Sequence, residues 1–200
     1  MLSDEGRPII NIRGDAVALG PLRRDFLHLY EQWFNDFEAT LAYSHQLRPF
    51  TRESREEWYA RTAEGEPDTV QFAIYEASAM RPIGWSLLDR INHFDRTAEY
   101  GIFIGDKTSW GKGYGTETTV LMLDYGFSVL NLHNIMLRVD SYNERAIRAY
   151  RHAGFCEFGR RHEARRSGNH SYDIVYMEHL ATAFHQSRLH ELVPEPGTLK

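Results

Sequence analysis

Glycines alternate with larger residues in one segment of this chain, Ser109–Glu117, which reads SWGKGYGTE. The glycines Gly111, Gly113 and Gly115 precede a stretch with helical periodicity, so the segment predicts a loop that leads into a helix. Backbone N–H groups in such a loop can bind phosphate, and the positive end of the helix dipole favours the same anion. The alternative interpretation of this segment alone is a glycine-rich connection without a ligand.

Two common phosphate-binding patterns do not fit the loop. The P-loop requires two glycines separated by four residues and followed by Lys and then Ser or Thr. In this chain Gly105 and Gly111 are separated by five residues, and Lys112 is followed by Gly113. The dinucleotide pattern Gly-x-Gly-x-x-Gly also fails, because the sixth position counted from Gly111 is Thr116.

A second segment with regularly spaced functional residues runs from Asn143 to Phe155. On a helix, Ala146 and Tyr150 share a face, and Asn143 lies one turn earlier on the same side. Taken alone, the spacing is more typical of Asn143 as a helix N-cap and Tyr150 as a half-buried aromatic residue than of a binding site.

Together the two segments resemble the GNAT acetyltransferase superfamily. The loop is similar to its pyrophosphate loop, Gln/Arg-x-x-Gly-x-Gly/Ala, with Trp110 at the first position. Asn143 through Phe155 matches the second motif, Asn-x-x-Ala-x-x-x-Tyr-x-x-x-Gly-Phe. Within the superfamily the chain looks most like the branch of ribosomal-protein alanine and spermidine N-acetyltransferases. The resemblance runs from about Val70 to Leu180.

The resemblance implies that acetyl-CoA is the co-substrate. Backbone groups of the strand that ends near Ile104 would bind the pantetheine arm, and the loop N–H groups would bind the pyrophosphate. Asn143 would bond the pantetheine arm from the other side, and Ala146 would leave room for it. The predicted cofactor contacts are Ile102, Phe103, Ile104, Trp110, Gly111, Lys112, Gly113, Tyr114, Gly115, Thr116, Asn143 and Ala146.

The implied reaction is direct attack of a primary amine on the thioester in a ternary complex. An alkylammonium has a pKa of about 10.4, so the amine must first lose a proton. Glu99 is the expected base, directly or through water, and its ordinary alternative is an ion-paired carboxylate. A strand N–H near Phe103 or Ile104 would stabilise the oxyanion, and Tyr150 would protonate the departing thiolate.

The acceptor is left open between a polyamine, a peptide or protein N-terminus, an amino sugar and an amine antibiotic. The alternative function is a non-catalytic acyl-CoA binding or sensing module, which would have no use for Tyr150 and Glu99. Family resemblance also suggests a homodimer or a larger homo-oligomer.

Composition narrows the class of protein. The 200 residues predict a single domain over 1–180 and a C-terminal extension over 181–200. A formal net charge of −5 argues against general nucleic-acid binding. Cys156 is the only cysteine and is expected in the core, so no disulfide within the chain and no metal site are expected. Without an apparent signal peptide or membrane segment, we expect a cytoplasmic protein.

Hydrophobic periodicity and turn residues predict the elements that carry these residues. The pattern is typical of an α+β (α/β) fold around one mixed central sheet. Family resemblance implies about six to seven strands, flanked by helices and splayed between the fourth and fifth strands. The expected helices are Asp25–Phe37, Thr51–Ala63, one from the glycine loop to Asn131, and Asn143–Ala153. The expected strands are Val17–Leu22, Val70–Glu76, Pro82–Leu88, Thr97–Ile104, Ile135–Val139, Phe155–Arg161 and Tyr172–Met177.

Overall fold

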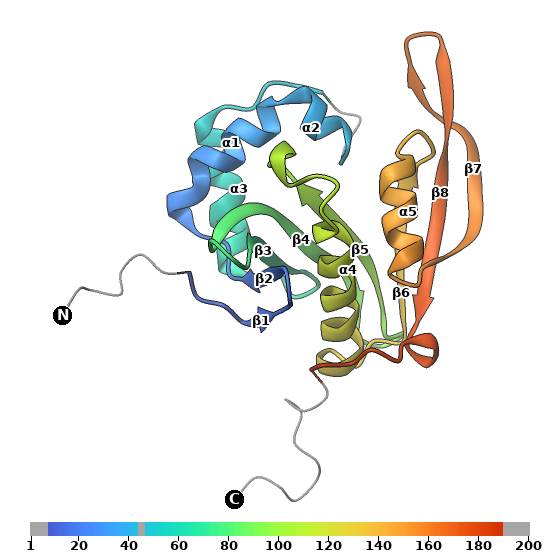
Figure 1. Ribbon diagram of the computed structural model, residues 1–200. Coiled ribbons are helices and arrows are strands. Elements are labelled where there is room, and N and C mark those ends of the chain that lie inside the picture. The colour runs from blue at the N-terminus through green and yellow to red at the C-terminus, as the bar shows by residue number, and fades with distance from the viewer. Residues whose placement is uncertain (1–7, 44–46, 190–200) are drawn as a thin grey trace, which may run out of the picture. The chain divides into compact units, whose positions relative to one another are not determined.

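A computed structural model describes residues 8–43 and 47–189 of the chain (Figure 1). The α-helices in this part are α1 (Leu27–Asn35), α2 (Phe37–Leu41), α3 (Arg52–Glu64), α4 (Tyr114–Asp124) and α5 (Glu144–His152). The strands are β1 (Ile12–Arg13), β2 (Val17–Gly20), β3 (Val70–Glu76), β4 (Arg81–Asn92), β5 (Thr97–Ile104), β6 (Asn134–Asp140), β7 (Cys156–Ser167) and β8 (His170–Leu180).

All strands belong to one sheet in the order β1-β2-β3-β4-β5-β6-β8-β7. The pairing of β5 with β6 is parallel, whereas β6 with β8 and β7 with β8 are antiparallel. The sheet therefore has eight strands in the described residues, more than the six to seven expected. The additional strand is β1, which pairs with β2 over two residues and is too short to produce a periodic pattern. The mixed α/β architecture is confirmed.

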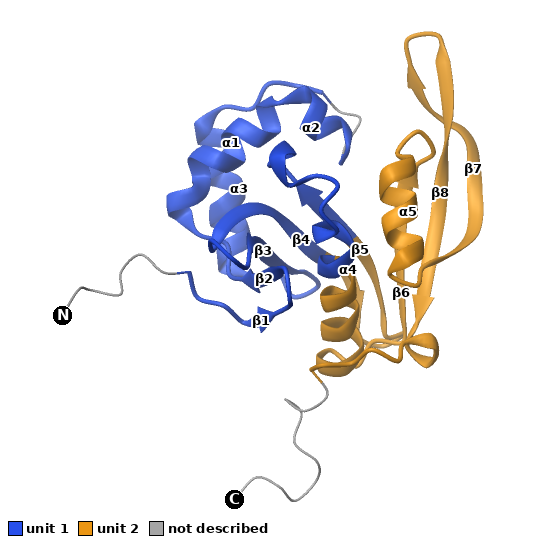
Figure 2. Ribbon diagram, viewed as in Figure 1, with its two compact units in different colours: residues 1–87, 101–118 blue, residues 88–100, 119–200 orange. Residues whose placement is uncertain are grey.

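The chain forms two compact units, which Figure 2 colours separately. Unit 1 contains residues 1–87 and 101–118, and unit 2 contains residues 88–100 and 119–200. Strands β4 and β5 and helix α4 each contribute residues to both units. The expected splay would concern the placement of the two units and stays a prediction.

Unit 1 is built around an aromatic core. Residues of α1 and α2 pack with Trp85 of β4 and Phe103 of β5. Asp36 divides the single helix expected over Asp25–Phe37, because its backbone is extended and its side chain caps the first turn of α2. Thr51 caps α3 by accepting a hydrogen bond from the N–H of Ser54, as predicted.

Unit 2 places α5 against the sheet of β6, β8 and β7 (Figure 1). Gly154 ends α5 with a φ of +99°, a left-handed conformation that glycine adopts at low cost. The β7–β8 hairpin turns at Gly168, and both of its strands are longer than expected.

One expectation for unit 2 was wrong. Cys156 is exposed rather than in the core, because it begins the edge strand β7 and points away from the buried side on which Phe155 lies. The segment after Leu180 begins with a three-residue 3-10 helix, Ala181–Ala183. The rest of the predicted C-terminal extension beyond residue 189 lies outside the described residues.

Candidate active site

The glycine loop has the backbone geometry that its sequence predicts. Gly111 and Gly113 have φ angles of +76° and +82°, in the left-handed region that favours glycine. Gly115 has an ordinary φ, since α4 has already begun at Tyr114. The loop residues Gly111 to Gly113 are exposed, so their backbone faces solvent next to a helix N-terminus. This arrangement can accept an anion such as a phosphate group.

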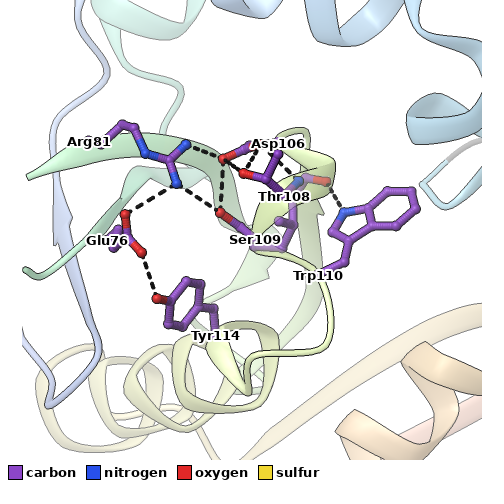
Figure 3. A network of polar contacts seen from close by, with 8 residues as sticks. Glu76, Arg81, Asp106, Thr108, Ser109, Trp110 and Tyr114 are labelled. Carbon is purple, nitrogen blue, oxygen red and sulfur yellow. Dashed lines mark hydrogen bonds and ion pairs between the residues drawn. The ribbon is translucent and has the colours of Figure 1, made fainter. Parts of the chain in front are cut away.

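Short-range hydrogen bonds fix the chain immediately before the glycines (Figure 3). Asp106 caps the 3-10 helix Lys107–Ser109 and accepts hydrogen bonds from the N–H and hydroxyl of Thr108. The indole N–H of Trp110 donates to the carbonyl oxygen of Ile104 at 2.9 Å. Trp110 therefore connects the loop to the end of β5. The family motif has Gln or Arg at this position, so the sequence did not predict this contact.

A charged network connects both ends of the loop to β3 and β4 (Figure 3). The guanidinium of Arg81 pairs with Asp106, with Glu76 at 3.2 Å, and with the hydroxyl of Ser109 at 3.3 Å. On the other side, the hydroxyl of Tyr114 donates to Glu76 at 2.7 Å. Sequence analysis missed Glu76, Arg81 and Asp106, because they lie in different elements and no local pattern relates them.

The network changes the ionisation of its carboxylates. Burial alone would raise the pKa of Asp106, but hydrogen bonds from Arg81, Thr108 and Ser109 outweigh it and lower the pKa to about 2. The hydrogen bond from Tyr114, opposed by partial burial and aided by Arg81, lowers the pKa of Glu76. Both groups are therefore anionic at neutral pH and keep the loop in one arrangement.

The predicted pantetheine-binding strand supplies one core residue and two half-buried ones. Phe103 is 2% exposed and packs in the aromatic core, whereas Ile102 and Ile104 are partly exposed. The carbonyl of Ile104 already accepts the Trp110 indole N–H. A carbonyl oxygen has a second lone pair, so this contact leaves it able to accept one more donor.

Helix α5 positions Asn143 and Tyr150 as its sequence pattern predicts. Asn143 caps the helix, and its side-chain oxygen accepts the N–H of Ala146 at 3.1 Å, which confirms the N-cap interpretation. Tyr150 is 9% exposed, and its ring meets Tyr100 edge to face at 6.2 Å and Phe155 at 6.0 Å. These contacts fix the direction of the phenol ring.

Glu99 lies between two arginines. Its carboxylate pairs with Arg138 at 2.5 Å through one oxygen and with Arg90 through the other. The group lines a cavity of about 550 Å³ in unit 2, together with Met136 and Tyr176. Strand residues alternate between faces, so Glu99 and its neighbour Tyr100 point to opposite sides of β5. Because Tyr100 contacts Tyr150, the structure does not bring Glu99 and Tyr150 into contact.

The predicted site residues divide between the units. The glycine loop and Ile102 to Ile104 belong to unit 1, whereas Glu99, Asn143, Ala146 and Tyr150 belong to unit 2. Within 8–43 and 47–189, no cluster of three His, Cys, Asp or Glu side chains is arranged to hold a metal ion. No helix in the same ranges has the length and apolar character needed to span a membrane.

Comparison with known protein sequences supports one family. A sequence profile described as acetyltransferase (GNAT) domain matches residues 17–156. Spermidine N(1)-acetyltransferase of Escherichia coli strain K12 is 32% identical over 151 residues, which cover 70% of this chain and 73% of that protein. Spermidine N(1)-acetyltransferase of Vibrio cholerae is 37% identical over 86 residues, or 43% of this chain and 49% of that protein.

Solved structures agree with the sequence relatives. V. cholerae spermidine N-acetyltransferase in complex with CoA and spermine matches with a TM-score of 0.76 and 27% identity, covering 86% of this chain and 99% of that chain. A dodecameric structure of the V. cholerae enzyme matches with a TM-score of 0.69 and 27% identity, covering 84% and 96%. On this evidence, the chain belongs to the GNAT acetyltransferase family and is an N-acetyltransferase.

Proposed function

We propose that this enzyme moves the acetyl group of acetyl-CoA to a primary amine, and that the amine attacks the thioester directly in a ternary complex. The observation that carries the proposal is the loop before α4, where Gly111 and Gly113 both have left-handed backbones. An exposed loop of this kind at a helix N-terminus suits a pyrophosphate. The V. cholerae relative, which has CoA in its solved complex, supports the choice of donor.

The proposed donor contacts are those that the family resemblance implies. In unit 1, backbone N–H groups from Gly111 to Thr116 would bind the pyrophosphate, with Trp110, Lys112 and Tyr114 beside them. Backbone groups of Ile102, Phe103 and Ile104 would bind the pantetheine arm as an added strand would. In unit 2, Asn143 and the small side chain of Ala146 would complete the contacts to the same arm. We propose that both units act as one acetyltransferase domain.

The chemistry requires one carbonyl addition, the loss of two protons from the acceptor nitrogen and the gain of one proton by the CoA sulfur. The ammonium of the acceptor loses a proton, and its nitrogen forms a bond to the thioester carbon. The N–H of Phe103 or Ile104 would stabilise the oxyanion of the tetrahedral intermediate. The carbon–sulfur bond then breaks, and Tyr150 would give its proton to the CoA thiolate. The nitrogen loses its second proton as the neutral amide forms, and this proton restores the Tyr150 phenol. The ring contacts of Tyr150 with Tyr100 and Phe155 support this role, because they hold the ring that carries the hydroxyl in one direction.

Glu99 is the proposed base, and its surroundings favour action through water. Both of its carboxylate oxygens already accept a hydrogen bond from an arginine, Arg90 or Arg138. Each oxygen keeps a second lone pair, so a water can still donate to it. Because Glu99 and Tyr150 lie on opposite sides of β5, a chain of water rather than direct contact would carry the proton from the amine to Glu99.

For the acceptor we propose a class of compound rather than one molecule, and for the assembly a homo-oligomer without a stated number of subunits. A polyamine, a peptide or protein N-terminus, and an amine-bearing small molecule such as an antibiotic are all candidate acceptors. The spermidine acetyltransferases among the relatives support an amine, and the dodecameric relative supports a homo-oligomer. We propose a cytoplasmic enzyme without a nucleic-acid or membrane partner.

The test is release of free CoA thiol from acetyl-CoA across a panel of amines that includes polyamines, peptides, amino sugars and aminoglycosides. We expect thiol release with at least one class of amine. Tyr150→Phe should lower kcat about 100-fold or more while the affinity for acetyl-CoA changes little, because only the proton donor is removed. Glu99→Gln should lower the rate most at low pH, where the amine is protonated.

Calorimetric titration of acetyl-CoA provides the control for both variants. Tight binding of acetyl-CoA without thiol release on any amine would contradict the proposed function and favour an acyl-CoA binding module. Unchanged turnover of Tyr150→Phe would remove that residue from the mechanism, and an unchanged pH profile of Glu99→Gln would do the same for the base.

A further inference from the structure

A buried guanidinium lies in the helical half of unit 1. Arg55 of α3 is 8% exposed. The central carbon of its guanidinium lies 4.2 Å from the ring centre of Phe50, 4.6 Å from that of Phe34 and 5.7 Å from that of Trp58. These distances place the cation in a cage of three aromatic rings, where cation–π attraction applies.

The cage lacks a negative charge. Among the described residues no carboxylate pairs with Arg55, and its buried Nε has no hydrogen-bond partner. A second guanidinium, that of Arg48, lies 5.0 Å from the centre of the same Phe50 ring. Burial, followed by repulsion from Arg48 and Arg61, lowers the pKa of Arg55. The guanidiniums of Arg55 and Arg48 therefore lie on the same aromatic ring, and among the described residues no carboxylate forms an ion pair with either.

The aromatic rings around Arg55 are held in place, whereas Arg48 is an exposed residue at the edge of the cage. The side-chain amide of Asn35 in α1 donates to the carbonyl of Phe50 at 2.8 Å and accepts its N–H at 2.9 Å. Phe34, the second ring of the cage, packs on Phe103 with 5.3 Å between ring centres. The guanidinium is thus one aromatic residue away from the strand proposed to bind the donor.

The positive charge of Arg55 and Arg48 determines the charge of a ligand that could bind beside them. A buried charge without a counter-ion is costly, and aromatic rings recover only part of that cost. An arginine fork binds carboxylate or phosphate through two parallel hydrogen bonds, and a neighbouring arginine strengthens the attraction. A polyamine would instead be repelled by Arg48 and Arg55.

We propose that Arg55 and Arg48 bind an anionic group of the acceptor, so that the acceptor is a primary amine that also carries a carboxylate or a phosphate. This inference rests on the proposed function and narrows it. It distinguishes this chain from its spermidine-acetylating relatives, whose named acceptor carries no acid.

The first test compares acceptors in matched pairs that differ only in the anionic group. A peptide with a free C-terminal carboxylate is paired with its C-terminal amide, and glucosamine 6-phosphate is paired with glucosamine. We expect kcat/KM to favour the anionic member of at least one pair by about tenfold to a hundredfold, the range of a charge-assisted hydrogen bond. The pair that shows the preference distinguishes carboxylate from phosphate.

Variants assign the preference to the cage. Arg55→Met keeps an apolar stem between the rings and should abolish the preference, while Arg55→Lys keeps the charge and should retain part of it. The control is Arg52→Gln on the same helix, an exposed arginine paired with Glu56 at 3.4 Å, which should leave the preference unchanged. Equal use of both members of every pair, or a preference that survives in Arg55→Met, would overturn the inference.

A second readout does not depend on turnover. Inorganic phosphate and acetate should raise the Tm of the wild-type chain more than that of Arg55→Met, because a ligand that binds only the folded state stabilises it. An equal rise in both proteins would contradict the anion site even if amines are acetylated. Conversely, absence of acetylation with an Arg55-dependent rise in Tm would refute the proposed function and support the anion site.

Discussion

At the scale of single residues, the shape of the glycine loop depends on backbone geometry more than on side-chain chemistry. Gly111 and Gly113 have positive φ angles, and a Cβ atom added to either would meet no other atom within 4 Å. The two glycines are therefore required by conformation and not by crowding. Gly115 also has free space around it, but its φ is ordinary, so it provides an internal comparison.

Gly113→Ala should lower the free energy of unfolding by about 1 kcal/mol, the cost of a left-handed backbone at a residue with a Cβ. The same change should raise the KM for acetyl-CoA, since the loop N–H groups would turn away from their present directions. Chemical denaturation and initial-rate measurements check the two effects.

The matched control is Gly115→Ala, because Gly115 lies in the first turn of α4 without a positive φ. This change should leave the free energy of unfolding unchanged or raise it slightly. If both alanine variants destabilise the protein equally, the conformational explanation of the loop is wrong.

At the scale of elements, the loop is held by residues from the strands beside it. Arg81 of β4 connects Glu76 of β3 to Asp106, and Tyr114 of α4 returns to Glu76. The loop is therefore anchored on both sides of its glycines. Preorganisation of this kind lowers the entropy that a bound donor would otherwise have to remove.

Asp106→Asn should lower the free energy of unfolding at pH 7 by about 2 kcal/mol, given a pKa lowered to about 2 from the usual 3.8. The sign follows from linkage: the depressed pKa stabilises the fold above the unfolded-state value, and this contribution is lost as the pH falls from about 4 to about 2. The difference between variant and wild type should shrink over that window, as urea unfolding at several pH values would measure.

An exposed aspartate in the turn before β3, Asp68, provides the control for this experiment. Asp68→Asn should change the free energy of unfolding by less than about 0.5 kcal/mol at every pH. A difference between Asp106→Asn and wild type that stays constant from pH 7 to the acid limit would contradict the assigned ionisation.

The sequence predicts most elements because their signals are local. Thr51 before α3, Asn143 before α5 and Gly154 after it are capping residues, and the structure confirms all three. Local signals also explain the failures. Asp36 splits the first predicted helix by capping α2, and a two-residue strand such as β1 has no period to detect.

In the candidate site, the sequence predicts the residues that lie close together in the chain and misses the contacts between distant segments. The loop glycines and the Asn143–Tyr150 spacing are contiguous patterns, so the sequence reveals them. The two arginines around Glu99 come from β4 and β6, and the cage around Arg55 combines α1, α3 and the segment between α2 and α3. Such partners depend on tertiary packing, which no spacing in the sequence encodes.

At the scale of the whole molecule, sequence and fold both place the chain in the GNAT acetyltransferase family. The GNAT domain match over residues 17–156 includes residues of both compact units, and the structural relatives confirm the expected fold. The acceptor that we propose, an acidic amine, rests on the unpaired positive charge around Arg55 and differs from spermidine, which the names of the relatives give as their acceptor. Acetyl transfer to an amine is common to both.

The most direct test of the central claim is to follow an isotope-labelled acetyl group from acetyl-CoA by mass spectrometry of both the acceptor and the intact enzyme. Direct attack predicts that the label appears on the acceptor nitrogen, with one CoA released for each amide formed and no labelled enzyme at any time. A labelled acyl-enzyme that precedes the product, or bound acetyl-CoA without labelled amide on any amine, would contradict the account.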